Sequence, residues 1–156
     1  MSFSHFDEHG ASQMVDVSRK EETLRTSTAS GLVRLNHQVW ERIQAAEPLA
    51  KGNVLEVARL AGILAAKHTA TLIPLCHPLP LHAVKIEFTF PRPEYIRIQA
   101  EATLTGRTGV EMEALAAVSI SALTIYDMCK SLDKSIVIEQ IQLEKKTGGK
   151  SGTWSR

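Results

Sequence analysis

The sequence predicts an α+β fold, in which a few antiparallel strands carry helices on one face. Residues 84–90 and 95–104 alternate apolar and polar side chains on either side of a short turn, a pattern typical of a β-hairpin. Residues 110–126 are almost continuously apolar and rich in alanine, as in a buried helix. Because strands and helices do not strictly alternate along the chain, a Rossmann sheet is not expected.

The first half of the chain is expected to form one strand and two helices. Residues 23–35 contain several threonines and predict a strand, in which Gly31 indicates a bulge or kink. A short helix is predicted over residues 36–46, since it must stop before the next proline. Asn53 is a good N-cap for a second helix, which should run from residue 54 to about residue 67.

The second half is expected to contain the hairpin, a long helix and a last strand. Three prolines between residues 74 and 80 rule out regular structure before the hairpin. Two glycines after the hairpin lead into a helix predicted over residues 110–130. The last strand is predicted over residues 136–143.

The composition is that of one compact domain. The chain has 156 residues, of which 44% are hydrophobic, enough for a core without disulfides or metals. We therefore expect a single domain over residues 1–156, with the polar residues 1–13 and 145–156 mobile. The net charge of +1 gives no overall field that would attract nucleic acid or an anionic membrane surface.

Cysteine usage and hydrophobicity predict a soluble, cytoplasmic protein. Cys76 and Cys129 do not make a disulfide framework, which indicates a reducing compartment. Residues 1–10 lack the apolar core of a signal peptide. The longest apolar run is interrupted by Glu111 and Glu113, so no stretch reaches the ~20 residues that a membrane span requires.

An acid and an amine lie three residues apart at the end of this long apolar run. At that spacing Asp127 and Lys130 share one face of the predicted helix. Buried charges are costly unless they are paired or used, so the two form either a structural ion pair or an acid–base pair. The spacing alone favours the structural pair. If the two do chemistry, we expect them to lie in a cleft that excludes water.

Lysines and glycines gather in the C-terminal tail and before the second helix. Residues 145–152 place lysines beside glycines, so that ammonium and backbone N–H groups could hold a phosphate. The segment lacks the first glycine of a P-loop, and a solubilising disordered tail is the alternative. Lys51 stands just before the helix start expected at residue 54, where free N–H groups and the helix dipole favour anions.

The proline-rich loop presents a thiol and an imidazole. His77 could exchange protons or bind a phosphate, and Cys76 could be a nucleophile. Neighbouring side chains usually point apart, so a catalytic Cys76–His77 dyad is not expected. A small buried hydrophobe is the simpler explanation of Cys76. The other histidines show no spacing to cysteines or acids that would indicate a zinc site.

The long helix begins with two acids. Glu111 suits the positive end of the helix dipole. Glu113 lies roughly on the face of Asp127, but the two are separated by 14 residues. At ~1.5 Å per residue this distance is about 21 Å, so the two cannot hold one reacting atom from one chain. A pocket that used both would be long or would join two subunits.

Seven segments along almost the whole chain match one family in sequence and order. They are residues 14–18 (MVDVS), 51–54 (KGNV), 58–63 (ARLAGI), 72–79 (LIPLCHPL), 104–115 (LTGRTGVEMEAL), 123–130 (LTIYDMCK) and 146–152 (KTGGKSG). Together they resemble the molybdenum cofactor biosynthesis protein C (MoaC) family, the cyclic pyranopterin monophosphate synthases. No single segment is specific, but their combination is.

The resemblance implies a ferredoxin-like antiparallel sheet and a lyase reaction in molybdenum cofactor biosynthesis. The substrate would be a cyclised guanosine triphosphate, 3′,8-cyclo-7,8-dihydroguanosine 5′-triphosphate. The products would be cyclic pyranopterin monophosphate and pyrophosphate. No cofactor would be required, although Mg²⁺ could accompany the triphosphate. Members of the family assemble as hexamers built from dimers, with active sites at the dimer interfaces.

The resemblance also implies roles for particular residues. Asp127 and Lys130 would carry the acid–base work, assisted by Lys51. The residues implied to line the substrate site are Leu75, Cys76, His77, Met112 and Glu113, and those implied to hold phosphates from the mobile tail are Lys146 and Lys150. Two alternatives stay open. A binding module for nucleotides or pterins would use the same groups without turnover, and a thiol-based transfer would depend on Cys76.

Overall fold

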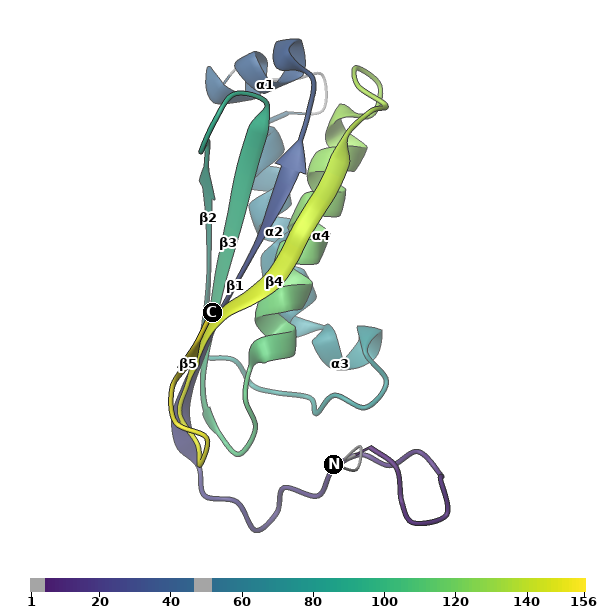
Figure 1. Ribbon diagram of the computed structural model, residues 1–156, viewed down its shortest axis with the longest axis vertical. Coiled ribbons are helices and arrows are strands. Elements are labelled where there is room, and N and C mark those ends of the chain that lie inside the picture. The colour runs from purple at the N-terminus through teal and green to yellow at the C-terminus, as the bar shows by residue number, and fades with distance from the viewer. Residues whose placement is uncertain (1–4, 47–51) are drawn as a thin grey trace.

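The computed structural model describes residues 5–46 and 52–156. Its strands are β1 (Thr23–Arg34), β2 (Ala83–Thr89), β3 (Tyr95–Gly106), β4 (Val137–Thr147) and β5 (Trp154–Ser155). Its helices are α1 (His37–Gln44), α2 (Val54–Lys67), α3 (Thr69–Leu72) and α4 (Glu111–Cys129). The two long helices, α2 and α4, lie together on one face of the sheet (Figure 1), which confirms the predicted α+β class.

The strands of the described part form one antiparallel sheet in the order β2-β3-β1-β4-β5. β1 lies in the middle and pairs with β3 over its whole length, beginning with Thr23 opposite Gly106. Its register with β4 shifts between Ser30 and Leu32, which confirms the irregularity expected at Gly31. The succession of β1, α2, β2, β3, α4 and β4 is consistent with a ferredoxin-like arrangement.

The remaining predicted helices and strands are also found, with three additions: α3, a longer β4 and the two-residue strand β5. α3 is a single helical turn directly after α2 that the sequence pattern did not indicate. β4 continues to Thr147, beyond the predicted end at residue 143, because Lys145 and Lys146 pair with both β1 and β5. The structure assigns a conformation to residues 5–13 and 145–156, and their mobility stays a prediction.

α4 is the central helix of the hydrophobic core. Small residues on its buried face, such as Ala114, Ala117 and Val118, are fully buried. A Cβ atom at Gly31 would lie 2.8 Å from Val118 Cγ1, so the glycine allows the strand and the helix to approach closely. By length and composition α4 could cross a membrane, but 50% of that stretch is buried inside this structure.

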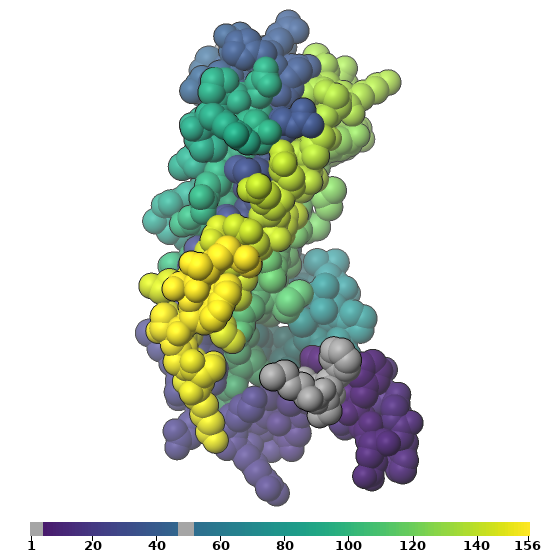
Figure 2. Space-filling model, in the orientation of Figure 1, coloured from purple at the N-terminus to yellow at the C-terminus, as the bar shows by residue number. Residues whose placement is uncertain are grey.

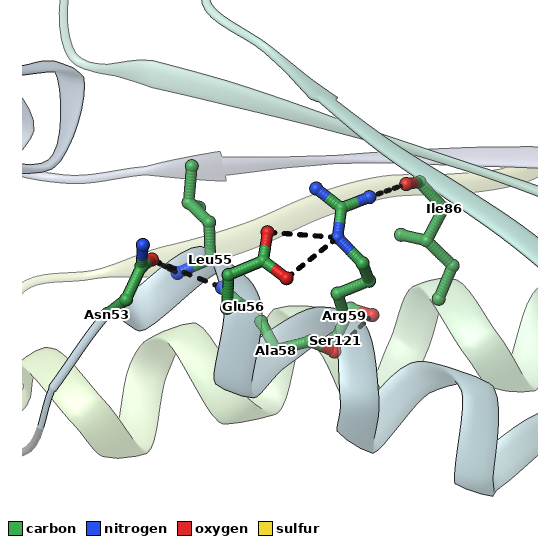
Figure 3. A network of polar contacts seen from close by, with 7 residues as sticks. All are labelled: Asn53, Leu55, Glu56, Ala58, Arg59, Ile86 and Ser121. Carbon is green, nitrogen blue, oxygen red and sulfur yellow. Dashed lines mark hydrogen bonds and ion pairs between the residues drawn. The ribbon is translucent and has the colours of Figure 1, made fainter. Parts of the chain in front are cut away.

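α2 and α4 pack against each other in antiparallel orientation. Ser121 Oγ donates a hydrogen bond of 3.0 Å to the carbonyl oxygen of Ala58 (Figure 3). One turn further along α2, a Cβ atom at Gly62 would lie 2.8 Å from the carbonyl oxygen of Ala117, one turn earlier in α4. The start of α2 therefore lies at the C-terminal end of α4 (Figure 1), the end to which Asp127 belongs.

Side chains in the first turns of α2 fix where this helix begins and how it meets the sheet. The Asn53 side chain accepts hydrogen bonds from the backbone N–H groups of Leu55 and Glu56, at 3.1 and 3.2 Å (Figure 3). This confirms the predicted N-cap. Arg59 pairs with Glu56 at 3.1 Å and also donates to the carbonyl oxygen of Ile86 in β2. The start of α2 is thus tied to the edge of the sheet.

The close contact at Gly62 predicts the effect of a single methyl group. In Gly62→Ala the added Cβ would collide with Ser121 Oγ and the Ala117 carbonyl oxygen. We expect the free energy of unfolding to fall by about 1–3 kcal/mol through overpacking, although alanine is the better helix former by about 1 kcal/mol. Urea unfolding measures the change. Ala61→Gly is the control for helix propensity, and a Gly62→Ala chain as stable as the wild type would contradict the packing described.

Candidate active site

A cavity of about 310 Å³ lies at the N-terminal end of α4. The proline-rich loop before β2 and the first turn of α4 form two of its walls. Five of the residues that line it are those implied to bind substrate: Leu75, Cys76, His77, Met112 and Glu113. Thus the fold gathers into one place side chains that lie far apart in the sequence.

A second cavity of about 330 Å³ adjoins the first. Both are lined by His77, Leu79 and Glu113, so these side chains stand where the two spaces meet. The second cavity extends toward the end of α2 and is also lined by His68 and Thr69. Together the two spaces offer room for a ligand longer than either alone.

Sequence reasoning did not identify several residues of the first cavity. His5 lines it from the N-terminal end of the described chain, and Thr108 and Gly109 line it from the turn before α4. The turn lies within a matching family segment, but Thr108 and Gly109 carry no charge that would single them out. His5 has no local signal, because its approach to the cavity depends on the whole fold.

Glu113 is the most perturbed acid in the cavity. Its side chain is buried, with 3% of the residue exposed. Burial raises the pKa of the carboxyl group to about 7; a hydrogen bond from its own backbone N–H opposes this shift, and the charge of Glu111 adds to it. A carboxyl group with such a pKa can both give and accept a proton near neutral pH.

The thiol and the imidazole of the loop have different surroundings. Burial, and then the charge of Glu113, raise the pKa of the half-buried Cys76 thiol, so it stays protonated near neutral pH. This argues against Cys76 as a nucleophile. The ring of His77 forms a hydrogen bond with the N-terminal part of the chain, since its Nε2 lies 2.9 Å from the carbonyl oxygen of Val15.

One cation contacts a residue that lines the cavity, and two others are candidate anion ligands. The Lys146 Nζ is 2.8 Å from Glu111 Oε1, and Glu111 lines the cavity. This lysine belongs to β4, whereas Lys150 lies in the exposed turn between β4 and β5. Gly149, in the left-handed region with φ +70°, lies over Arg25, because a Cβ atom there would collide with the guanidinium group. Arg25 is therefore a further candidate anion ligand that the sequence pattern did not indicate.

Asp127 and Lys130 lie at the opposite end of α4. Their side chains form an ion pair of 2.6 Å and are 58% and 53% exposed. The hydrogen bond and charge of Asp127 raise the pKa of the Lys130 amine, so it is an ammonium group near neutral pH. Neither residue occurs among the described residues that line the two cavities. Exposed pairs of this kind contribute little to stability.

The expectation that this pair lies in a cleft that excludes water is wrong for the single chain. The apolar run of α4 buries only part of the helix surface. Leu123, which is 53% exposed, precedes Asp127 by four residues and Lys130 by seven, so all three lie on one outward stripe. The burial of the run before them does not extend to this face.

The candidate residues thus form two groups. One group surrounds the cavity at the start of α4, and the other consists of Asp127 and Lys130 at its end. Lys51, the third residue implied in acid–base work, lies outside the described residues. Within the described ranges 5–46 and 52–156, no cluster of three or more His, Cys, Asp or Glu side chains could hold a metal ion.

Comparison with known proteins gives a single family. A family model described as the MoaC family matches residues 14–149. The chain is 53% identical to the cyclic pyranopterin monophosphate synthase of Desulfitobacterium hafniense, over all of this chain and 95% of that protein. It is 55% identical to the protein of that name from Desulforapulum autotrophicum, over 97% and 93% of the two chains. It is 53% identical to cyclic pyranopterin monophosphate synthase 1 of Mycobacterium tuberculosis, over 100% and 91%.

The buried carboxyl group of Glu113 predicts a pH dependence of stability. Its pKa is about 7 in the folded chain, against 4.5 when the group is solvated. The buried neutral carboxyl group therefore makes its full contribution to the free energy of unfolding below pH 4.5, and this contribution is lost as the pH rises through 7. Between these limits the free energy of unfolding should fall by about 3 kcal/mol relative to Glu113→Gln. Urea unfolding of both chains across this range measures it, and parallel profiles would contradict the desolvation of Glu113.

Proposed function

The chain belongs to the MoaC family, and on this premise we propose that it is a cyclic pyranopterin monophosphate synthase. Its reaction is the conversion of 3′,8-cyclo-7,8-dihydroguanosine 5′-triphosphate to cyclic pyranopterin monophosphate and pyrophosphate, which makes it a lyase. The observation that carries the proposal is the cavity at the start of α4, which collects all five side chains expected to line the substrate site.

The chemistry of this cavity suits the reaction. Opening a purine ring and closing it again as a pterin needs several proton transfers and no net redox step. Glu113 supports such transfers, because its pKa of about 7 lies at the working pH. His77 stands where the two cavities meet, so its ring can contact a ligand in either space.

The candidate cations suit a triphosphate. Formation of a cyclic phosphate with loss of pyrophosphate requires positive charge on the phosphate oxygens. Lys146 on β4 contacts Glu111 of the cavity lining, Arg25 is on the neighbouring β1, and Lys150 is on the turn that follows β4. Lys146 pairs with the carboxylate of Glu111. A phosphate that bound Lys146 would take the place of this carboxylate as the partner of the ammonium group.

The separation of the two groups of residues supports a site shared between chains. Asp127 and Lys130 cannot reach the cavity of their own chain, so we place them in the cavity of a second copy. Both helices expose apolar side chains that a second copy could cover: Val57, Leu60 and Leu64 on α2, and Leu123 on α4. We propose that the chain assembles as a hexamer built from dimers, with active sites at the dimer interfaces, and that Lys51 assists the acid–base work.

In this shared site Lys130 supplies the positive charge or the proton that the cavity lacks. Its amine is held as an ammonium group by Asp127, so it acts first as an acid or an electrostatic ligand. We expect the substrate to enter with Mg²⁺ on its triphosphate, because phosphate oxygens are the hard ligands that this ion prefers. The two free cysteines suit a reducing compartment, and we place the reaction in the cytoplasm.

Loss of the ammonium group tests the proposal. Lys130→Ala should lower the rate of pyrophosphate release from the cyclised nucleotide by at least about 100-fold, the usual contribution of a positioned acid or base. The fold should be unchanged, because the side chain is exposed in the single chain, and size-exclusion chromatography should show the oligomeric state of the wild type. Lys134→Ala, an exposed lysine nearby, is the matched control and should keep wild-type activity.

The outcomes separate the alternatives. A wild-type chain that binds the nucleotide but releases no pyrophosphate would leave a binding module and overturn the synthase. A Lys130→Ala chain with near wild-type turnover would overturn the role of Lys130. Cys76→Ser should stay largely active, because the thiol is protonated near neutral pH.

A further inference from the structure

The N-terminal segment, defined as residues 5–22, lies beside the candidate site. In the space-filling view these residues, in purple, gather at the end of the molecule that also carries the teal residues of α3 (Figure 2). His5 lines the 310 Å³ cavity. Val15 and Val17 are half-buried, whereas Met14, Asp16 and Ser18 between and beside them are exposed. The segment therefore turns one side toward the body of the protein.

Internal hydrogen bonds give this segment a defined course before β1. The Asp7 carboxylate accepts from the backbone N–H groups of His9 and Ala11, at 2.9 and 2.8 Å. The N–H of Gln13 donates to the carbonyl oxygen of His5 at 3.0 Å and closes the loop. These bonds bring the chain back on itself, so that residues 5 and 13 stand together before Val15.

The contact between this segment and His77 fixes a proton. A carbonyl oxygen accepts hydrogen bonds and cannot donate, so the His77 Nε2 at 2.9 Å from the Val15 oxygen must carry the hydrogen. A neutral ring then has its lone pair on Nδ1. The unprotonated nitrogen can accept a hydrogen bond from a donor group of a ligand, whereas the protonated nitrogen repels such a group.

We propose that the N-terminal segment is a wall of the substrate site and that Val15 is a positioning residue within it. Its carbonyl oxygen holds His77 in the Nε2-protonated form, so Nδ1 is the acceptor that the ring offers to the substrate. The proposal rests on the proposed function, because the ligand of the cavity is a substrate only if the chain is a synthase. The docking and the tautomer are properties of the free protein and are measured without turnover.

Limited proteolysis tests the docking on the full chain. Trypsin can cleave after Arg19 and Lys20, which are exposed but need local opening of the segment to enter the protease. His77→Ala removes the donor and should speed this cleavage about fivefold, the change expected for loss of one ordinary hydrogen bond. His77→Gln keeps an N–H donor near the position of Nε2 and should be cleaved at nearly the wild-type rate. Equal rates for the wild type and His77→Ala would overturn the docking.

Nitrogen NMR measures which ring nitrogen of His77 carries the proton. Packing of the segment without the hydrogen bond to Val15 would leave both tautomers populated. In the wild type at a pH where His77 is neutral, Nε2 should be protonated and Nδ1 unprotonated; the His77→Gln spectrum identifies the signals. A chain lacking residues 1–16 should show both tautomers, with circular dichroism to verify its fold. A wild-type ring protonated on Nδ1, or an unchanged ring in the truncated chain, would overturn the role of Val15. A fixed tautomer in a chain without pyrophosphate release would instead overturn the proposed function.

Discussion

The fixed length of α4 is the constraint on which the whole arrangement depends. A helix rises ~1.5 Å per residue, so Glu113 in its first turn and Asp127 in its last lie about 21 Å apart. Packing of its small residues against the sheet and α2 fixes the helix in the core. Because α2 runs antiparallel, its capped start lies beside Asp127. One chain therefore presents its two groups of candidate residues at opposite ends of one helix.

The two groups of candidate residues differ in solvation. Glu113 is desolvated and carries a proton that it can exchange near neutral pH. Lys130 is exposed and stays charged because Asp127 lies 2.6 Å away. Covering Lys130 with a second copy would exclude water and disfavour its charged form, while Asp127 would continue to favour it. Association would thus give the amine the environment that acid–base work requires.

Local chemistry made much of the fold readable from the sequence. Asn53 caps α2 through its own side chain, and alternation identified the hairpin strands, because both signals act over a few residues. The continuation of β4 to Thr147, the approach of Gly149 to Arg25 and the bond from His77 to Val15 join segments far apart in sequence. No local pattern encodes such contacts. The single chain forms no cleft around the exposed Lys130, and the sequence could not show this, because periodicity cannot tell which face of a mostly apolar helix stays open.

The most direct test of a site shared between chains is complementation of two variants. Lys130→Ala and Glu113→Gln, each inactive alone, are dissociated together, reassociated and assayed for pyrophosphate release. If every site takes Lys130 from one chain and Glu113 from its neighbour, random reassociation restores about one quarter of wild-type activity. Mixtures that stay as inactive as the separate variants, although mixed oligomers form, would show that both residues must belong to one chain, and would contradict the shared site.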